Sequence, residues 1–396
     1  MSNNLSNTYD LVIIGGGIHG AGIAQAAAVH GWSVLVLEQT DIASGTSSRS
    51  SKLIHGGLRY LESGQISLVR ECLNERALLL KLAPQLVQLK PFHIPVYRHT
   101  QRRPWQLQVG LSLYALLGGL QSAARFRRVP QSQWNNLDGL ETTGLQTVFQ
   151  YYDAQTDDAA LTRAVMRSAQ ELGAQLIMPA TFIAAQSHAQ GSSIEYRYNG
   201  EIKTCNASVL VNAGGPWVQQ VLSRITPAPT QRKIDLVQGT HIVVPGKLTQ
   251  GIYYVEAPTD GRAVFVMPWK DNTLVGTTES VYHGDPGEVK PLPQEQAYLL
   301  QTLAHYFPQH RGQQNILSTT AGLRVLPADE GAAFSRSRET ILHLDRSDHP
   351  NNARLLTVYG GKLTTYRLTA ERVVARLAGV LPRRKAVADT RQLRLS

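Results

Sequence analysis

Three glycines near the start of the chain are spaced as in sites that bind a dinucleotide. Gly15, Gly17 and Gly20 form the pattern GxGxxG directly after the apolar run 11–14. The first glycine of such a turn permits a tight reversal, the second lets the backbone approach a pyrophosphate, and the third lets a helix pack on the strand. The helix that follows presents unpaired N–H groups and the positive end of its dipole to the phosphates.

An acidic residue extends this pattern. Glu38 follows the next short apolar run, 34–37, close to the position about 20 residues beyond the glycines where a carboxylate binds a ribose hydroxyl. A carboxylate at this position disfavours a 2′-phosphate, and therefore NADP. The pattern thus predicts a dinucleotide site, and the alternative is a Gly-rich turn without a ligand.

Hydroxyl-rich and glycine-rich segments further along indicate which dinucleotide is bound. Thr46, Ser47 and Ser48 follow the acidic residue, and the turns 213–217 and 360–364 each follow a short apolar run. Strand ends form the ligand crevice of an open α/β sheet, so these turns can supply the extra contacts that an extended cofactor such as FAD requires. For the stretch 46–48 taken alone, a surface loop is the alternative.

The elements that must position these residues are predicted from the apolar pattern. The runs 11–14, 34–37, 209–211 and 355–358 are typical of parallel strands buried on both faces. Helices are expected after Gly20, over about 67–82, after Asp158 and up to Leu377. Between about 231 and 285 the apolar residues alternate as in antiparallel strands.

The order of these elements predicts an α/β fold with a Rossmann-like FAD-binding domain built from discontinuous segments and an inserted α+β substrate domain with an antiparallel sheet. The expected FAD-binding domain comprises residues 1–90, 150–230 and 317–382. The expected substrate-binding domain comprises residues 91–149 and 231–316, and residues 383–396 are expected to form a basic tail that either assists binding or is disordered.

Five motifs occur in the order found in a known family. They are GGGIHGAG (15–22), TSSRSSKLIHGGLRYLE (46–62), VNAGGPWV (211–218), QGTHIVVP (238–245) and YGGKLTTYR (359–367). Over nearly its whole length the chain resembles the FAD-dependent glycerol-3-phosphate dehydrogenases, within the D-amino-acid-oxidase-like flavoproteins. The resemblance implies one non-covalent FAD, oxidation of sn-glycerol 3-phosphate to dihydroxyacetone phosphate by hydride transfer to the flavin, and a quinone or another electron acceptor.

The resemblance also assigns residues to the site. His241 and Arg324 are expected to be catalytic, with His241 as the base or with Arg324 polarising the oxygen. Their alternatives are structural: a histidine satisfied within a strand, and an arginine paired with an acid. The residues expected to bind substrate are Arg59, Tyr60, Lys362 and Thr364. The residues expected to contact FAD are Gly15, Gly17, Ile18, Gly20, Glu38, Gln39, Thr46, Ser47, Ser48, Lys52, Leu53, His55, Gly56, Gly57, Phe182, Ala213, Gly214, Trp217, Gly360, Gly361, Lys362, Leu363 and Thr364.

The sequence departs from the family pattern at several places. His19 stands where asparagine is common, Gly214 where threonine is frequent, and Val325 where proline usually follows the arginine. Familiar members also continue into a helical C-terminal domain, whereas this chain ends soon after Tyr366. A different phosphorylated or carboxylated alcohol is therefore an alternative substrate. A flavin oxidase of a hydroxy or amino acid and a non-catalytic FAD redox sensor are alternative functions.

Composition limits the partners. The 396 residues carry a net charge of +10, which favours anionic partners such as a phosphorylated substrate or an anionic membrane. Two cysteines without CxxC spacing, and scattered histidines and carboxylates, predict neither a disulfide framework nor a metal site. A single GxGxxG pattern predicts no separate NAD site, and no recognition motif for nucleic acid accompanies the basic charge.

One segment suggests contact with a membrane. Residues 105–120 are largely apolar, too short to span a bilayer, and flanked by arginines at 102–103 and 125–128. This pattern is typical of a helix lying in a membrane interface, and a core helix with solvated flanking charges is the alternative. The N-terminus lacks a signal-peptide pattern. We therefore expect a cytoplasmic protein, either free or peripheral on the inner face of the cytoplasmic membrane, whose oligomeric state the sequence does not indicate.

Overall fold

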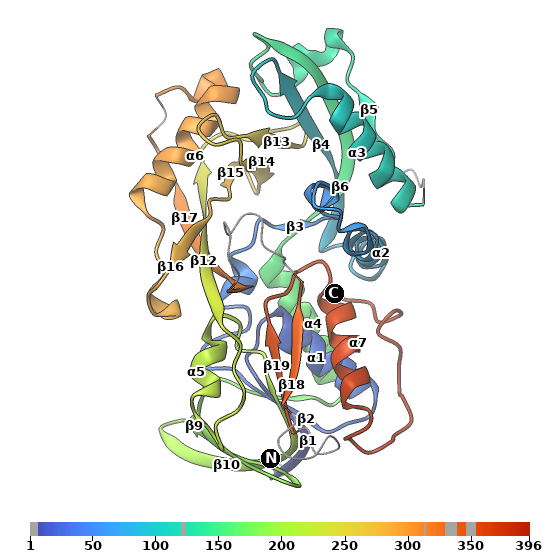
Figure 1. Cartoon of the computed structure of the whole chain (residues 1–396), viewed down its shortest axis with the longest axis vertical. Helices are drawn as coiled ribbons and strands as arrows, with labels where there is room; N and C mark the ends of the chain where they lie inside the picture. Colours follow the sequence, from blue (N-terminus) through green and yellow to red (C-terminus); the bar gives the residue numbers. More distant parts are fainter. Residues whose placement is uncertain (1–6, 120–123, 313, 329–338, 346–353) are drawn as a thin grey trace.

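The chain folds around two large β-sheets, one above the other in the view of Figure 1. The structure is a computed structural model, and it describes residues 7–119, 124–312, 314–328, 339–345 and 354–396. The α-helices in these ranges are α1 (Ile18–Val29), α2 (Ile66–Leu82), α3 (Pro104–Leu117), α4 (Asp158–Glu171), α5 (Val218–Leu222), α6 (Pro293–Tyr306) and α7 (Tyr366–Leu377).

The first sheet contains the parallel strands expected of a dinucleotide fold. Strand order is β11-β8-β9-β10-β1-β2-β7, with β19 also paired to β10 and β18 paired to β19. Its strands are β1 (Thr8–Ile14), β2 (Val34–Leu37), β7 (Gln175–Ile177), β8 (Ala180–His188), β9 (Gly191–Tyr198), β10 (Glu201–Asn212), β11 (Ile225–Thr226), β18 (Ile341–Asp345) and β19 (Leu355–Tyr359). Strands β10, β1, β2 and β7 run parallel, so their carboxyl ends lie at one edge of the sheet.

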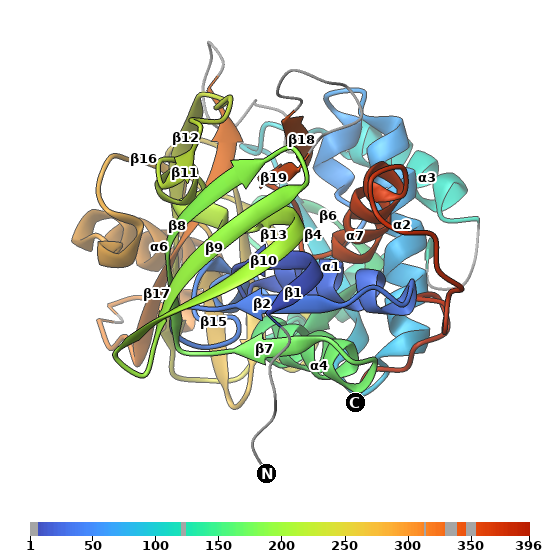
Figure 2. The same cartoon turned by 90° about the horizontal axis from the view of Figure 1, so that it is seen from below.

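The core of this sheet follows from the apolar runs of the sequence. Every residue of β2 is buried, and only the first residue of β1 is exposed. Helix α1 is rich in alanine and buried almost all round, because it lies between α4 and α7 against the sheet (Figure 2). Gly22 allows this close packing, since a Cβ there would lie 2.8 Å from a ring carbon of Tyr366.

The second sheet forms the other half of the molecule. Strand order is β16-β12-β15-β14-β13-β4-β6-β3, with β17 also paired to β12 and β5 paired to β6. Its strands are β3 (Leu53–Ile54), β4 (Val87–Tyr97), β5 (Arg127–Arg128), β6 (Leu145–Thr156), β12 (Ile234–Val244), β13 (Ile252–Glu256), β14 (Ala263–Trp269), β15 (Asn272–Gly276), β16 (Ser280–Tyr282) and β17 (Ser318–Pro327). Most pairs are antiparallel, as the alternating pattern predicts, while β13 pairs with β4 in parallel.

Sheet membership differs from the segment boundaries predicted from the sequence. Strands β4 and β6 pair from Val87 with Thr156 to Tyr97 with Leu145, so the boundaries at 90/91 and 149/150 fall inside continuous strands. Strand β17, in a segment predicted to belong to the FAD-binding domain, pairs along β12 in the second sheet. The physical reason is that β4 and β6 pair along their whole length, so the residues on both sides of each of these boundaries belong to the second sheet.

The C-terminal segment 383–396 packs against the first half of the molecule. Its backbone donates hydrogen bonds to α1 and α2, from Val387 N to Val29 O and from Leu395 N to Leu82 O, both at 2.8 Å. Leu395 is buried, and Arg384 forms a 2.8 Å ion pair with Asp10. The structure therefore contradicts the alternative of a disordered tail. Among the helices of the described residues, none combines the length and apolar character needed to cross a bilayer.

Candidate active site

A cavity lies between the two sheets and is lined by residues from both. From the first sheet come the turn after β1, the end of β2 and the turns after β10 and β19. From the second sheet come side chains of β12, β14 and β17. Strand ends of the dinucleotide fold therefore face a wall of side chains across one cavity, which is where an open α/β sheet binds its ligands.

The turn after β1 is shaped by its glycines. Gly15 has a φ of +109°, and a Cβ there would lie 2.7 Å from the carbonyl oxygen of Ala213. A Cβ on Gly20 would lie 1.9 Å from the carbonyl oxygen of Gly15. These contacts are with backbone atoms, which cannot move aside. The glycines thus bring the N-terminus of α1 against the cavity, as pyrophosphate binding requires.

Glu38 lies at the end of β2 with its carboxylate held by the backbone. Its Oε2 accepts a hydrogen bond from Gly16 N at 2.6 Å, and its Oε1 accepts one from Thr40 N at 2.9 Å. The side chain lines the cavity although the residue is largely buried. A carboxylate fixed in this way beside the glycine turn is positioned to bind a ribose hydroxyl.

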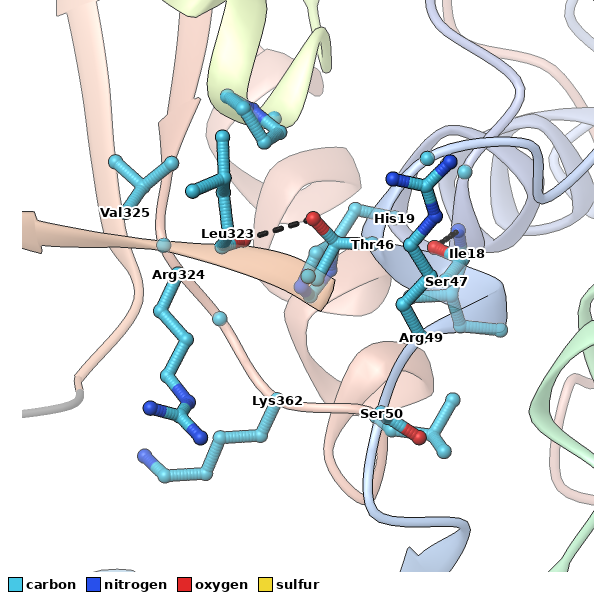
Figure 3. Close-up of a pocket in the computed structure, with 18 of the residues that line it drawn as sticks. Ile18, His19, Thr46, Ser47, Arg49, Ser50, Leu323, Arg324, Val325 and Lys362 are labelled. Atoms are coloured by element: carbon cyan, nitrogen blue, oxygen red, sulfur yellow. Dashed lines mark hydrogen bonds between the residues drawn. The ribbon is translucent and has the colours of Figure 1, made fainter. Parts of the chain in front are cut away.

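The loop 46–48 joins the two halves of the site, as Figure 3 shows. The Ser47 hydroxyl accepts a 2.9 Å hydrogen bond from Ile18 N at the start of α1. The Thr46 hydroxyl donates a 2.7 Å hydrogen bond to Leu323 O on β17. The loop is therefore tied both to the helix that would bind a pyrophosphate and to the wall of the second sheet.

Most of the residues predicted to contact FAD are brought together along this cavity. The lining residues of that set are Gly15, Gly17, Ile18, Glu38, Gln39, Thr46, Ser47, Leu53, His55, Gly57, Phe182, Ala213, Gly214, Trp217, Gly360, Gly361, Lys362, Leu363 and Thr364. Four predicted residues do not line it: Gly20, Ser48, Lys52 and Gly56. Lys52 instead turns to Asp158, with Nζ 2.6 Å from Oδ1, and Ser48 donates a hydrogen bond to Gly45 O.

Gly56 is held by a buried network that sequence reasoning missed. Its N–H lies 2.9 Å from the Tyr114 hydroxyl oxygen and 3.3 Å from Asp153 Oδ1. Tyr114 on α3 donates to Asp153 Oδ2 at 2.6 Å, and Arg76 on α2 pairs with Asp153 at 2.5 Å. A Cβ on Gly56 would lie 2.3 Å from the Tyr114 hydroxyl, which explains the glycine. Three distant elements thus fix the segment 55–57 beside the cavity.

Cationic side chains gather in the part of the cavity beside β17. The side chains of Arg324 on β17 and Lys362 after β19 converge, with their charged ends near each other (Figure 3). Lys362 Nζ lies 5.2 Å from the centre of the Tyr60 ring, and Arg59 lines the same cavity. The predicted substrate residues are therefore brought together. Thr364 also lines the cavity, but its hydroxyl accepts a hydrogen bond from His55 N at 3.2 Å.

His241 lies on β12 in the cavity wall and is almost fully buried. Its Nε2 and the Ser51 hydroxyl are hydrogen-bonded at 2.9 Å, while Nδ1 has no hydrogen-bond partner among the described residues. Burial, with smaller contributions from Arg324 and Lys52, lowers its pKa to about 3. The imidazole is therefore neutral near pH 7. A Cβ on Gly276 would lie 2.2 Å from its Cδ2, so that glycine makes room for the ring.

His19, the departure noted in the glycine turn, also lines the cavity. Burial, with a smaller contribution from Lys362, lowers its pKa to about 4. Its Nδ1 has no hydrogen-bond partner in the part of the chain that the structure describes. The imidazole is therefore a neutral group facing the cofactor end of the cavity.

Two charged residues of the cavity were missed in the sequence. Glu279 follows β15, and its Oε1 lies 3.2 Å from Arg324 Nη1. Arg262, before β14, lines the cavity, pairs with Asp260 at 2.6 Å and donates to Glu279 O at 3.0 Å. The position of Glu279 just beyond a strand was the available signal. Within the described ranges, no group of three or more His, Cys, Asp or Glu side chains could hold a metal ion.

Comparison with known proteins agrees with this architecture. Residues 10–376 match the family described as FAD dependent oxidoreductase. A glycerol-3-phosphate dehydrogenase from Pseudomonas aeruginosa is 39% identical over 386 residues, covering 94% of this chain and 72% of that protein. A D-erythritol 1-phosphate dehydrogenase from Brucella abortus is 36% identical over 381 residues, covering 95% and 74%.

A solved structure shares the fold. The glycerol-3-phosphate dehydrogenase from Bacillus halodurans, complexed with FAD, superposes with a TM-score of 0.74 at 27% identity, covering 100% of this chain and 68% of that one. The chain therefore belongs to the FAD-dependent oxidoreductases and, within them, to the glycerol-3-phosphate dehydrogenase family. Its cofactor is FAD, and the glycine turn, the fixed carboxylate of Glu38 and the cavity that both line fit this group. The predicted fold class and family are confirmed.

Proposed function

We propose that the protein oxidises sn-glycerol 3-phosphate, or a close phosphorylated alcohol, to the corresponding ketone, dihydroxyacetone phosphate for glycerol 3-phosphate. The observation that carries the proposal is that a guanidinium and an ammonium group, those of Arg59 and Lys362, line one cavity with Arg324 and the cofactor-binding turn. Guanidinium groups bind a phosphate dianion through fixed pairs of N–H donors, and a lysine adds a point charge. The dehydrogenases of glycerol 3-phosphate and D-erythritol 1-phosphate among the relatives support a substrate of this class.

Different residues of the cavity have different roles in the proposed reaction. FAD, when bound, supplies the acceptor for the hydride that leaves the carbinol carbon. In our proposal Arg59 and Lys362 hold the phosphate, and Arg324 donates a hydrogen bond to the reacting oxygen. His241 takes the hydroxyl proton, which it can do because its low pKa leaves the ring neutral. A bound phosphate dianion would raise that pKa and make His241 a stronger base.

The test is anaerobic reduction of the flavin in the purified FAD-loaded protein. Glycerol 3-phosphate is expected to bleach the flavin absorbance rapidly, while glycerol, lactate and an amino acid are not. Bleaching by lactate or an amino acid would instead indicate an oxidase of such acids. A flavin that none of these compounds reduces would contradict the proposal and favour a redox sensor.

We further propose that reduced flavin passes its electrons to a quinone or another acceptor at a membrane surface, where α3 rests. Trp105, Val109 and Leu116 are each more than 60% exposed, and their spacing places them on one side of the helix. The exposed basic residues Arg103 and Arg128 flank this face. Apolar side chains flanked by basic residues suit the interface of an anionic membrane.

Vesicle sedimentation tests this surface. The protein is expected to sediment with vesicles containing phosphatidylglycerol and to remain in solution with neutral phosphatidylcholine vesicles. Replacing Trp105 and Val109 together by serine should weaken sedimentation by about tenfold, because apolar area is lost from the interface. The matched control is Ile202→Ser, an equally exposed residue on β10 at the opposite end of the molecule (Figure 1). Unchanged sedimentation of the double variant would contradict the role of α3.

A further inference from the structure

We propose that Glu279 determines the selectivity of the site. By compensating the charge of Arg324, it makes this end of the cavity accept a neutral hydroxyl group and reject a second anionic group. The selected substrates would be phosphorylated polyols, as distinct from phosphorylated or simple carboxylic acids. This inference rests on the proposed function, because it concerns which molecules reach the same catalytic groups.

The first step is the geometry of the pair. Arg324 Nη1 lies 3.2 Å from Glu279 Oε1, and Arg324 Nη2 donates a 3.1 Å hydrogen bond to the Thr277 hydroxyl. The Glu279 side chain is only 8% exposed, and that of Arg324 is 23% exposed. A Cβ on Gly239 would lie 2.7 Å from Nη2, so the absence of a side chain at this position of β12 leaves room for the guanidinium. The guanidinium is thus held in one place beside a fixed carboxylate.

The second step is the balance of charge around this end of the cavity. Glu279 compensates Arg324, and Asp260 compensates the neighbouring Arg262. Arg262 also donates to the backbone carbonyl of Glu279, which links the two ion pairs. A guanidinium that already has a carboxylate partner attracts a further anion less strongly than one without.

The third step is the chemistry of the ligand. A hydroxyl group can donate a hydrogen bond to a carboxylate and accept one from a guanidinium at the same time. A polyol phosphate therefore satisfies both Glu279 and Arg324 with its hydroxyl groups while its phosphate binds elsewhere. A ligand carboxylate at the same position could accept from Arg324, but it would face the like charge of Glu279 in a partly desolvated site.

Ligand binding to the FAD-loaded protein tests this inference without turnover. Dissociation constants are measured from the change in flavin absorbance for dihydroxyacetone phosphate, 3-phosphoglycerate and inorganic phosphate. In Glu279→Gln we expect the affinity for 3-phosphoglycerate to increase by at least about tenfold relative to the affinity for dihydroxyacetone phosphate, because the like-charge repulsion is removed. The dissociation constant of inorganic phosphate should change by less than about threefold, because the phosphate subsite lies elsewhere in our proposal. An unchanged ratio, or an equal change for all three ligands, would overturn the inference.

Controls separate selectivity from a structural role. Glu279→Asp keeps the charge and should keep the ratio within about threefold of the parent. Glu288→Gln removes an exposed carboxylate nearby in the sequence and should change none of the three constants. The unaltered protein supplies a second test that needs no variant. It should bind the neutral amide of 3-phosphoglycerate about tenfold more tightly than the acid, and equal affinities would contradict the role of Glu279.

The outcomes also separate this inference from the proposed function. If glycerol 3-phosphate fails to reduce the flavin but the ratio of dissociation constants changes in Glu279→Gln, the role of Glu279 in selectivity is supported and the proposed reaction is contradicted. If the flavin is reduced rapidly but the ratio of dissociation constants is unchanged, the proposed reaction is supported and Glu279 has only a structural role.

Discussion

The turn after β1 and the wall formed by β12, β14 and β17 line the same cavity but are built in different ways. In the turn, backbone atoms of neighbouring residues make the site, and side chains are excluded by contacts as short as 1.9 Å. In the wall, side chains from separate strands make the site, and Arg324 meets a carboxylate 45 positions away in the sequence. The turn therefore depends on the absence of side chains, and the wall depends on their identity. The cofactor end should tolerate no added atom, whereas the substrate end should respond to each change of charge or position.

The largest expected effect comes from Gly20→Ala. Its Cβ would overlap the Gly15 carbonyl, so the turn must open and α1 must leave the sheet. We expect loss of bound FAD and destabilisation of more than about 4 kcal/mol, measured by flavin absorbance and by urea unfolding. The control is Gly110→Ala on α3, where nothing lies within 4 Å and helix propensity should add about 0.5–1 kcal/mol. A Gly20→Ala protein that retains FAD would contradict the claim that the turn tolerates no added atom.

A change of charge at the substrate end comes next. Lys362→Met should lower kcat/KM for glycerol 3-phosphate by about 10²–10³, because the proposed charged partner of the phosphate is lost from a partly buried site. The folded protein should remain yellow at saturating FAD, which separates this effect from that of Gly20→Ala. Lys247→Met, at a half-exposed lysine paired with Asp271, serves as the control. An unaltered KM and kcat in Lys362→Met would remove this residue from the phosphate site.

The same kind of substitution used at Gly20 should have a different result in the wall. Gly276→Ala places a Cβ 2.2 Å from a carbon of the His241 ring, so the ring must move away from Ser51. We expect kcat to fall by about 10–10² while FAD remains bound, since only the orientation of His241, the proposed base, changes. Stopped-flow reduction of the flavin measures the effect. Loss of FAD from this variant would contradict the distinction between the two regions.

The smallest effect concerns a buried histidine of the second sheet that does not line the cavity. His93 stacks on Tyr253, and burial lowers its pKa from 6.5 to about 4. Between these values the unfolded chain binds a proton that the folded chain does not, so stability is lost as pH falls, at up to about 1.4 kcal/mol per pH unit. His93→Gln should reduce this slope in urea unfolding at saturating FAD, without changing kcat. The exposed His283→Gln is the control, and an equal slope in parent and His93→Gln would contradict the prediction.

The cofactor end could be predicted because its information is local. The spacing of Gly15, Gly17 and Gly20 and the position of Glu38 lie within one strand–helix–strand unit, so the backbone of the turn and the place of this carboxylate both follow from one short segment. Lys52 shows the limit even there. Its sequence neighbours line the cavity, but its side chain turns to Asp158 on α4. The direction of a side chain depends on partners that the local pattern does not name.

The substrate end could be predicted only in part. Arg324 and Lys362 were found through motifs, and both line the cavity. Glu279 was missed because nothing in its own segment indicates a partner on β17. The segment after β15 comes close to β17 because β15 and β17 both pair with β12. Two of the predicted segment boundaries fall inside β4 and β6 for a related reason, since these two strands pair continuously within the second sheet.

The network around Gly56 has a consequence for measurement. Tyr114 extends inward from α3 to the N–H of Gly56, while Trp105 and Val109 face outward from the same helix. A displacement of α3 must therefore move Gly56 or break a hydrogen bond to it, and the neighbouring His55 and Gly57 line the cofactor cavity. The flavin would then serve as a label-free optical reporter of whatever contacts the outer face of α3. A spectral titration could follow binding at that distant surface.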